Sequence, residues 1–179
     1  IASASEQPAL AEAGGLPIGS LAFSLDGTLL AVGGGSSLRL WNTASGSLQA
    51  ELETEISDIS SVSFQPDGTA LVYGGADPAV WVWDMANSNQ VLLDGHVGTV
   101  SALVVSLEGN LIASADGESV RLWDATTGAN LAALPSPSSS VAFKPDGTLL
   151  ASGGLLGGAV LWGTSVGGEA TQAASSPET

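Results

Sequence analysis

The stretch SVSFQPDGTALVYGGADPAVWVWD, residues 61–84, decides the fold because it places two short apolar strands around a turn and ends a third strand in tryptophan. Side chains alternate between the two faces of a strand, so Val62 and Phe64 share one face. The Asp67-Gly68 pair accepts the positive φ of a tight turn and predicts a hairpin between the first two strands. The stretch therefore predicts antiparallel β structure.

The same pattern occurs four times along the chain. The other copies read SLAFSLDGTLLAVGGGSSLRLWN at 20–42, SALVVSLEGNLIASADGESVRLWD at 101–124 and SVAFKPDGTLLASGGLLGGAVLWG at 140–163. The closing tryptophans lie 42, 40 and 39 residues apart, at Trp41, Trp83, Trp123 and Trp162. The turns carry Asp26, Asp67, Glu108 and Asp146, and a more polar strand is expected after three of the tryptophans, at 47–52, 90–93 and 130–134. A constant period of this length marks a repeat architecture, so we predict an all-β chain of four units with four antiparallel strands each.

These residues resemble the WD40 family. The resemblance rests on Leu-Trp-Asn at 40–42, Val-Trp-Asp at 82–84, Leu-Trp-Asp at 122–124, Leu-Trp-Gly at 161–163, the Phe-x-Pro-Asp-Gly turns at Phe64 and Phe143, and Gly95-His96. It implies a β-propeller whose sheets are blades packed face to face. We expect blades at about 16–54, 55–94, 95–135 and 136–163, with an N-terminal segment at 1–15 and a flexible tail at 164–179.

Blades of this family often contain a buried hydrogen-bond network of Trp, Ser or Thr, His and Asp. Only the third copy has the Gly-His pair; Ala113 stands where the hydroxyl is expected, and Asp116 is one residue out of register. Asp77 lies at the expected distance before Trp83, in a copy that has no histidine. We therefore predict that no blade completes the network. We expect His96, the single histidine, to be a structural hydrogen-bonding residue and not part of a Ser-His-Asp catalytic site.

Composition limits the classes of function. Eighteen acidic residues against three basic ones give a net charge of −15, which would repel nucleic acid and anionic lipid and would favour a basic partner. There is no cysteine, and no apolar run approaches the roughly 18 residues of a membrane span. The glycine runs at 33–35 and 153–154 lie between strands with no lysine after them, and the acids form no calcium-loop array, so no cofactor and no metal are expected.

Two features are candidates for partner binding. Glu51, Glu53, Glu55 and Asp58 form the densest acidic cluster, which is either a docking surface for a basic partner or a charged edge that prevents aggregation between sheets. Trp81 shares a strand face with Trp83, where the first and third copies have arginine. It either fills a gap between blades or presents an apolar anchor to a partner.

The expected function is a non-enzymatic protein-interaction or assembly scaffold. The alternatives are a structural subunit of a larger complex or surface layer and, third, a hydrolase that uses the central channel of the propeller. A start at Ile1 and the single lysine, Lys144, favour an extracytoplasmic location over a cytoplasmic one.

The strand count predicts how the propeller closes. Residues after Trp162 make a poor outer strand, and Pro8–Glu12 stand where the outer strand of a preceding blade is expected. The N-terminal strand is therefore predicted to complete the fourth blade, within one chain or across a homodimer. Since family propellers usually have seven or eight blades, we predict an eight-bladed ring of two copies. A closed four-bladed ring and a fragment completed by a different chain are the alternatives.

Overall fold

The computed structural model describes residues 17–154, 158–164 and 171–175, and every regular element in these ranges is a β-strand. The strands form four antiparallel sheets, which we call the first to fourth blade. The first contains β1 (Ser20–Phe23), β2 (Leu29–Gly34), β3 (Ser37–Asn42) and β4 (Leu48–Glu53); the second β5 (Ile59–Phe64), β6 (Ala70–Gly75), β7 (Ala79–Asp84) and β8 (Gln90–Asp94); the third β9 (Ala102–Val105), β10 (Leu111–Ala115), β11 (Val120–Asp124) and β12 (Asn130–Leu134); the fourth β13 (Ser140–Phe143), β14 (Leu149–Gly153), β15 (Ala159–Gly163) and β16 (Thr171–Ser175). The prediction of an all-β chain with four four-stranded blades is confirmed.

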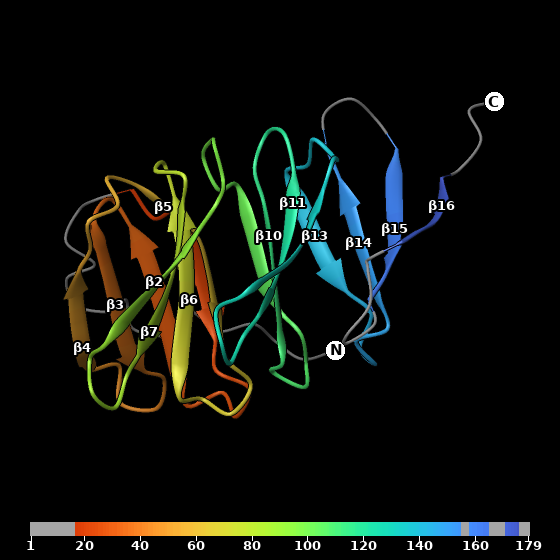
Figure 1. Cartoon of the computed structure of the whole chain (residues 1–179). Helices are drawn as coiled ribbons and strands as arrows, with labels where there is room; N and C mark the ends of the chain where they lie inside the picture. Colours follow the sequence, from red (N-terminus) through yellow and green to blue (C-terminus); the bar gives the residue numbers. More distant parts are fainter. Residues whose placement is uncertain (1–16, 155–157, 165–170, 176–179) are drawn as a thin grey trace, which may run out of the picture.

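The blades form an open arc. Within each blade the strands follow chain order from the inner edge to the outer edge. Contacts between inner strands join β1 to β5, β5 to β9 and β9 to β13. Figure 1 shows the first and fourth blades at opposite ends of the arc. The alternative of a closed four-bladed ring is therefore wrong.

The Asp-Gly turns are held by local hydrogen bonds. In the first hairpin, the Asp26 carboxylate accepts hydrogen bonds from the backbone N–H of Thr28 at 3.0 Å and from the Ser24 hydroxyl at 2.7 Å. Gly27 has a φ of 71°, a conformation that residues with a Cβ rarely adopt. Asp67 and Asp146 accept hydrogen bonds from the threonine two residues later in the same way. The repeated aspartate thus fixes the turn between the first two strands of the first, second and fourth blades.

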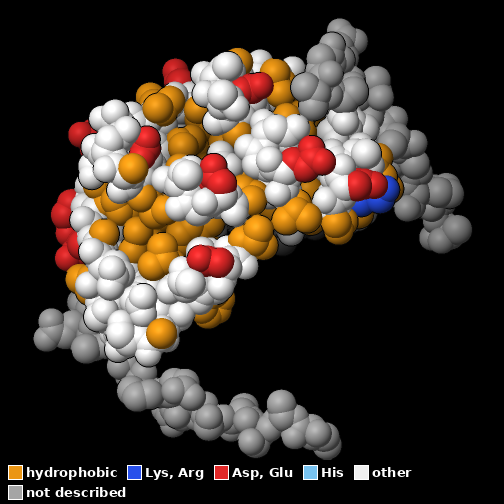
Figure 2. Space-filling model, turned by 90° about the horizontal axis from the view of Figure 1, so that it is seen from below, with side chains coloured by type: hydrophobic (Ala, Val, Ile, Leu, Met, Phe, Trp, Pro, Cys, Tyr) orange, Lys and Arg blue, Asp and Glu red, His pale blue; other side chains and the backbone are white. Residues whose placement is uncertain are grey.

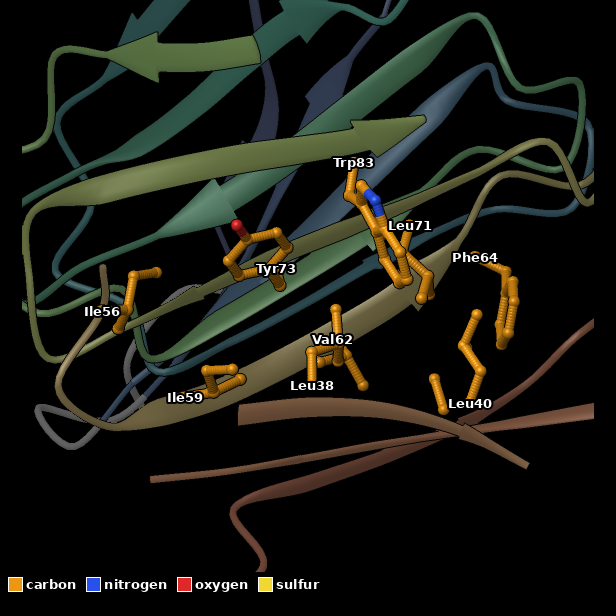
Figure 3. Packing of buried hydrophobic residues seen from close by; sticks show 10 residues of the cluster. Leu38, Leu40, Ile56, Ile59, Val62, Phe64, Leu71, Tyr73 and Trp83 are labelled. Carbon is orange, nitrogen blue, oxygen red and sulfur yellow. The ribbon is translucent and has the colours of Figure 1, made fainter. Parts of the chain in front are cut away.

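The tryptophan-bearing face of each blade packs on the opposite face of the preceding blade. Figure 3 shows this at the first junction, where Leu71, Tyr73 and Trp83 of the second blade lie against Leu38 and Leu40 of the first. Trp123 packs in the same way toward the second blade, and Trp162 toward the third. Full burial of one such side chain stabilises a fold by roughly 1.5–3 kcal/mol, so the apolar contacts at these three junctions favour blade stacking.

The outer strand of the fourth blade differs from the prediction. β16 pairs with β15 through Val160 opposite Ser175 and Gly163 opposite Thr171, with an irregularity between Leu161 and Trp162. The same irregularity occurs beside the tryptophan in the first and third blades. The expectation that the N-terminal segment supplies this strand is therefore wrong, as is that of a tail without structure at 171–175. Segment 1–15 and the rest of the tail lie outside the described residues.

Candidate functional site

The third blade contains a complete buried hydrogen-bond network, contrary to the prediction that no blade has one. Trp123 Nε1 donates to Ser114 Oγ at 2.8 Å, Ser114 Oγ lies 2.6 Å from His96 Nε2, and His96 Nδ1 lies 2.8 Å from the Asp116 carboxylate. The hydroxyl comes from Ser114 and not from position 113, because alternate residues of β10 face Trp123. The prediction that His96 is a structural hydrogen-bonding residue agrees with this geometry.

The chemistry of the four groups assigns the direction of the hydrogen bonds. The indole N–H can only donate and the ionised carboxylate can only accept, so Ser114 must donate to His96 Nε2 while His96 Nδ1–H donates to Asp116. A Ser-His-Asp catalytic triad has the same order of contacts. Here, however, Ser114 and Asp116 are fully buried and the serine oxygen already accepts the Trp123 N–H. No substrate can reach this hydroxyl, and the network therefore joins strands within the blade.

The other blades lack this network for two reasons. Val32 and Tyr73 occupy the position of Ser114 in the first and second blades, and the indole nitrogens of Trp41 and Trp83 are buried without a hydrogen-bond partner among the described residues. In the fourth blade, Trp162 Nε1 donates to Ser152 Oγ at 2.9 Å. Ser152 Oγ lies 3.2 Å from Ser136 Oγ, which in turn lies 3.1 Å from Ser138 Oγ, so hydroxyls replace the histidine and the carboxylate.

The network is expected to make the fold sensitive to mild acid. Burial lowers the pKa of His96 below its ordinary value of 6.5, against the opposing effect of Asp116. The unfolded chain therefore binds this proton more readily than the folded chain, and the stabilising contribution is lost as the pH falls below about 6.5. The ordinary pKa values of carboxylates lie below this window, so other titration contributes little there.

We expect the free energy of unfolding to fall between about pH 7 and pH 5 in the natural chain. A His96→Gln variant has no titrating ring and should show a flatter dependence. Urea unfolding at a series of pH values measures both slopes. Equal slopes in the two proteins would show that His96 is not the responsible group.

The acidic cluster begins on the outer strand of the first blade, with Glu51 and Glu53, and continues into the loop before β5, with Glu55 and Asp58. Glu51 forms an ion pair with Arg39 at 2.6 Å, and the Ser36 hydroxyl lies 3.5 Å from Glu53. Glu55 and Asp58 are also exposed. The glutamates of β4 are exposed while Ala50 and Leu52, which alternate with them, are partly buried, as the strand pattern predicts.

Trp81 packs against the apolar cluster between the first and second blades and is partly buried. The two arginines at the equivalent position make polar or cation–π contacts instead: Arg39 pairs with Glu51, and the Arg121 guanidinium lies 5.9 Å from the Trp123 ring centroid. This placement favours the gap-filling interpretation of Trp81 over that of an exposed anchor.

The first blade presents an apolar face that no other described blade covers. Val62 and Phe64 of the second blade are 6% and 7% exposed where they pack on the first blade. Their equivalents in the first blade, Leu21 and Phe23, hold the same register but are 58% and 65% exposed. Trp41 on the same face is nevertheless buried. The exposed part of this face therefore lies on the inner strand β1, and the part around Trp41 on β3 is buried.

The fourth blade presents the complementary face. Leu161 is 39% exposed, whereas its equivalents Leu40 and Leu122 are each 4% exposed beneath the next blade. Ala142 and Ala159 on the same face are exposed as well. We call the Leu21–Phe23 surface the leading face and the Leu161 surface the trailing face. Neither face stands out in the sequence, because which copy of a repeat stands at the end of a stack is a tertiary property.

A groove of about 430 Å³ runs along the inner side of the arc where the inner strands end. Its lining is mainly apolar and includes Phe23, Leu25, Val105, Leu107 and Phe143. Figure 2 shows apolar side chains gathered along this side, with acidic side chains on the turns around it. The groove touches all four blades and would line the channel of a complete propeller.

No three histidine, aspartate or glutamate side chains within the described ranges gather closely enough to hold a metal ion. The same part of the chain contains no helix with the length and apolar character needed to span a bilayer.

The sequence is similar to segments of several known proteins. Pre-mRNA-processing factor 19 homolog 2 of Arabidopsis thaliana is 37% identical over 73 residues, which are 40% of this chain and 14% of that protein. Telomerase protein component 1 of Rattus norvegicus is 38% identical over 73 residues, or 39% of this chain and 3% of that protein. Pre-mRNA-processing factor 19 of Oryza sativa subsp. japonica is 37% identical over 84 residues, or 44% and 16%. The chain thus spans only a small part of each relative.

The family described as "WD domain, G-beta repeat" matches four segments of the chain, at residues 12–42, 46–84, 87–124 and 132–162. Each segment ends at or beside one of the four repeated tryptophans, and each holds strands of the blade to which that tryptophan belongs. The matches make up most of the chain, and the chain therefore belongs to the WD40 repeat family.

Proposed function

We propose that this WD40 protein is a non-enzymatic scaffold that binds other proteins through the leading and trailing faces. The observation that carries the proposal is the difference in exposure between Phe23 at 65% and its packed equivalent Phe64 at 7%. Contiguous apolar surface of this kind is uncommon on soluble monomers and marks interaction sites. Burying it releases free energy in proportion to the apolar area removed from water.

The finer proposal is that the partner is a second copy of the chain, which produces an eight-bladed ring. Each internal junction packs the tryptophan-bearing face of one blade on the opposite face of the blade before it. The leading face is of the first kind and the trailing face is of the second, so the two ends are complementary. Two copies related by a two-fold axis would form two identical junctions and leave no end uncovered. No exchange of N-terminal strands is needed, because β16 completes the fourth blade.

The acidic edge is a second proposed surface, suited to a basic partner. Glu53 ends the outer strand of the first blade, Glu55 and Asp58 follow it in the loop that leads to β5, and all three are exposed. Among the described residues Arg39 neutralises only Glu51. The same charges would also prevent edge-to-edge pairing with the sheet of another molecule, a protection that exposed edge strands commonly require. Partner binding and protection against aggregation would thus depend on the same side chains.

The names of the relatives support a role for this chain as one component of a larger protein assembly. One relative is named as a component of telomerase, and two are named as pre-mRNA-processing factors. The net charge of −15 argues against direct contact with nucleic acid by this chain, because such contact requires cationic side chains to neutralise phosphates. We therefore assign to these blades a role in protein contacts only.

Replacing Phe23 with serine is expected to shift the chain from dimer to monomer. Phe23 is largely exposed in the single chain, so the monomer should keep its fold. In the ring it would be buried at two identical junctions, each worth roughly 1.5–3 kcal/mol. A weakening of the dimer by about 100-fold or more should follow, since each 1.4 kcal/mol is a factor of ten. Light scattering over a concentration series measures the mass.

Val91→Ser is the matched control, since Val91 is 52% exposed on the outer strand of the second blade, away from both end faces. It should leave the mass unchanged. A natural chain that stays monomeric at all concentrations would contradict self-association. A dimer unaffected by Phe23→Ser would show that the leading face is not the contact.

A further inference from the structure

Serine hydroxyls at the start of the inner strands join successive blades. Ser20 Oγ of the first blade accepts a hydrogen bond from the backbone N–H of Val62 in the second at 3.1 Å. Ser61 Oγ of the second blade accepts one from the backbone N–H of Leu103 in the third, also at 3.1 Å. Each serine lies opposite a glycine of the neighbouring strand, Gly33 or Gly74. These bonds connect the inner strand of one blade to that of the next.

The position is a repeat position, so its fourth occurrence can be identified by register. The third blade has Ala102 there, without a hydroxyl. In the fourth blade the residue opposite Gly153 is Ser140, which is exposed. Ser140 thus has the side chain that links blades elsewhere in the chain, at the end of the arc where the described residues supply no following blade.

The residue just before this position forms a second series of bonds. Ser60 Oγ donates to the carbonyl oxygen of Val100 at 2.5 Å, and Ser101 Oγ donates to that of Ser138 at 3.3 Å. The fourth blade has Ser139 at this position, and it is exposed.

The accepting residues and their equivalent at the first junction form a series of their own. Val100 and Ser138 precede the third and fourth inner strands and are 0% and 3% exposed. Their equivalent at the first junction is Ile59, the first residue of β5, which is 0% exposed although Gly19 offers it no hydroxyl. The equivalent residue before the first inner strand is Ile18, which is 51% exposed. The repeat position that is buried at every internal junction is therefore exposed at the leading end of the arc.

We propose that two hydroxyls of the trailing end recognise the leading end of a second copy: Ser139 donates to the carbonyl oxygen of Ile18, and Ser140 accepts from the backbone N–H of Leu21. This assignment rests on the self-association proposed above and specifies its register. It extends across the junction between copies the same pair of contacts that the chain forms between its own blades.

The geometry of Leu21 fits this role. In an antiparallel pair, every second residue directs its N–H away from the partner strand. Val62 does so opposite Tyr73, and its N–H is thereby free to reach Ser20. Leu21 holds the same place opposite Val32, so its N–H points from β1 toward the side where a preceding blade would lie.

The pair of bonds also determines which residues face one another. Apolar surfaces are non-directional, and the leading and trailing faces alone would tolerate sliding. A slip by one residue would point the Leu21 N–H away from Ser140, because side chains and backbone groups alternate along a strand. The two hydroxyls therefore act as positioning groups, while Phe23 and Leu161 supply most of the attraction.

The test measures dimer dissociation of the full chain by sedimentation, together with hydrogen exchange of the Leu21 amide. Ser140→Ala should weaken the dimer by about 30-fold or more, because it leaves a buried N–H without an acceptor at each of the two junctions. It should also speed exchange at Leu21 within the remaining dimer. Ser139→Ala should weaken the dimer by a similar factor without affecting the Leu21 amide. Ser57→Ala, an exposed serine in the loop before β5, is the matched control and should change neither.

The outcomes separate the two proposals. If the natural chain dimerises and Phe23→Ser disrupts it, but Ser140→Ala changes neither dissociation nor exchange at Leu21, this assignment is overturned while self-association stands. If the natural chain is monomeric and its Leu21 amide exchanges freely, both proposals are overturned. Loss of affinity with exposure of the Leu21 amide in Ser140→Ala alone supports the assignment.

Discussion

Replacing Asp116 with alanine is expected to lower the free energy of unfolding by about 3 kcal/mol, because a buried donor left without an acceptor costs roughly 1–3 kcal/mol and this carboxylate accepts from several donors. The carboxylate accepts hydrogen bonds from His96 Nδ1 at 2.8 Å and from the backbone N–H groups of Glu118 and Ser119 at 2.8 and 2.6 Å. Burial would raise the pKa of Asp116, but these donors hold it well below its usual value. Alanine would leave the buried His96 ring N–H without an acceptor and would also remove the acceptor of the Glu118 and Ser119 N–H groups.

Asp77→Ala is the matched control for this substitution. Asp77 follows the same strand of the second blade, yet its carboxylate accepts a hydrogen bond only from the Ser57 backbone N–H among the described residues, at 3.1 Å. Its loss should cost no more than about 1 kcal/mol. Urea unfolding of both variants gives the comparison. Similar losses at the two sites would mean that the third-blade network adds nothing beyond one ordinary loop contact.

A single methyl group at Gly75 is expected to destabilise the chain by about 3 kcal/mol, the upper end of the usual cost of overpacking. A Cβ there would overlap the backbone carbonyl of Asp58, far inside the 3.0 Å that real Cβ atoms keep, and would lie 3.0 Å from the Ile56 side chain. The obstacle is backbone and cannot rotate away. The loop that leads into β5 would have to move, together with the junction between the first two blades.

Gly117→Ala provides the comparison, because a Cβ at Gly117 meets no atom within 4 Å. Gly117 lies in the corresponding hairpin of the third blade, so chain entropy changes equally in both variants. Its stability should stay within about 0.5 kcal/mol of the natural chain. Thermal unfolding of the two proteins measures the difference. Equal melting temperatures would show that the loop before β5 yields without cost.

The same glycine explains why the second blade has no network. By register, Gly75 occupies in the second blade the position of Asp116 in the third. The carbonyl of Asp58 approaches so closely that no side chain fits there. The third blade accommodates a carboxylate because the loop containing Gly95 and His96 takes a longer course between its strands. Counting back from Trp83 selects Asp77 instead, but distance along the chain does not determine which residue faces the interior.

The periodicity of the sequence is sufficient to predict the architecture, because the four tryptophans and the turn acids repeat on a nearly constant spacing. It is insufficient for Ser114, since the network follows strand faces: Ile112 lies opposite Trp123, and Ser114, two residues on, shares its side. Position 113 points to the other side of the blade. Pairing the two strands outward from the Glu108-Gly109 turn identifies Ser114. The position of the turn determines which residues of the hairpin lie on the same face.

The outer strand of the fourth blade was missed for a different reason. Residues 171–175 read Thr-Gln-Ala-Ala-Ser and have no large apolar side chain to signal a strand. An edge strand is held mainly by backbone hydrogen bonds, which every residue except proline can supply. Its position after β15 follows the order of the other three blades. Topology therefore predicts β16 where hydrophobic patterning does not.

Because the leading and trailing faces differ from each other, their contact determines how an assembly of several molecules would grow. A contact between unlike surfaces repeats from molecule to molecule and yields a filament unless the curvature of the stack returns the last surface to the first. Closure after two molecules consumes both ends and stops elongation. A substitution that flattened the arc while sparing Phe23 and Leu161 would keep every contact yet lose closure. Such a change would convert a discrete particle into a fibre, and turbidity would reveal it where a binding assay would not.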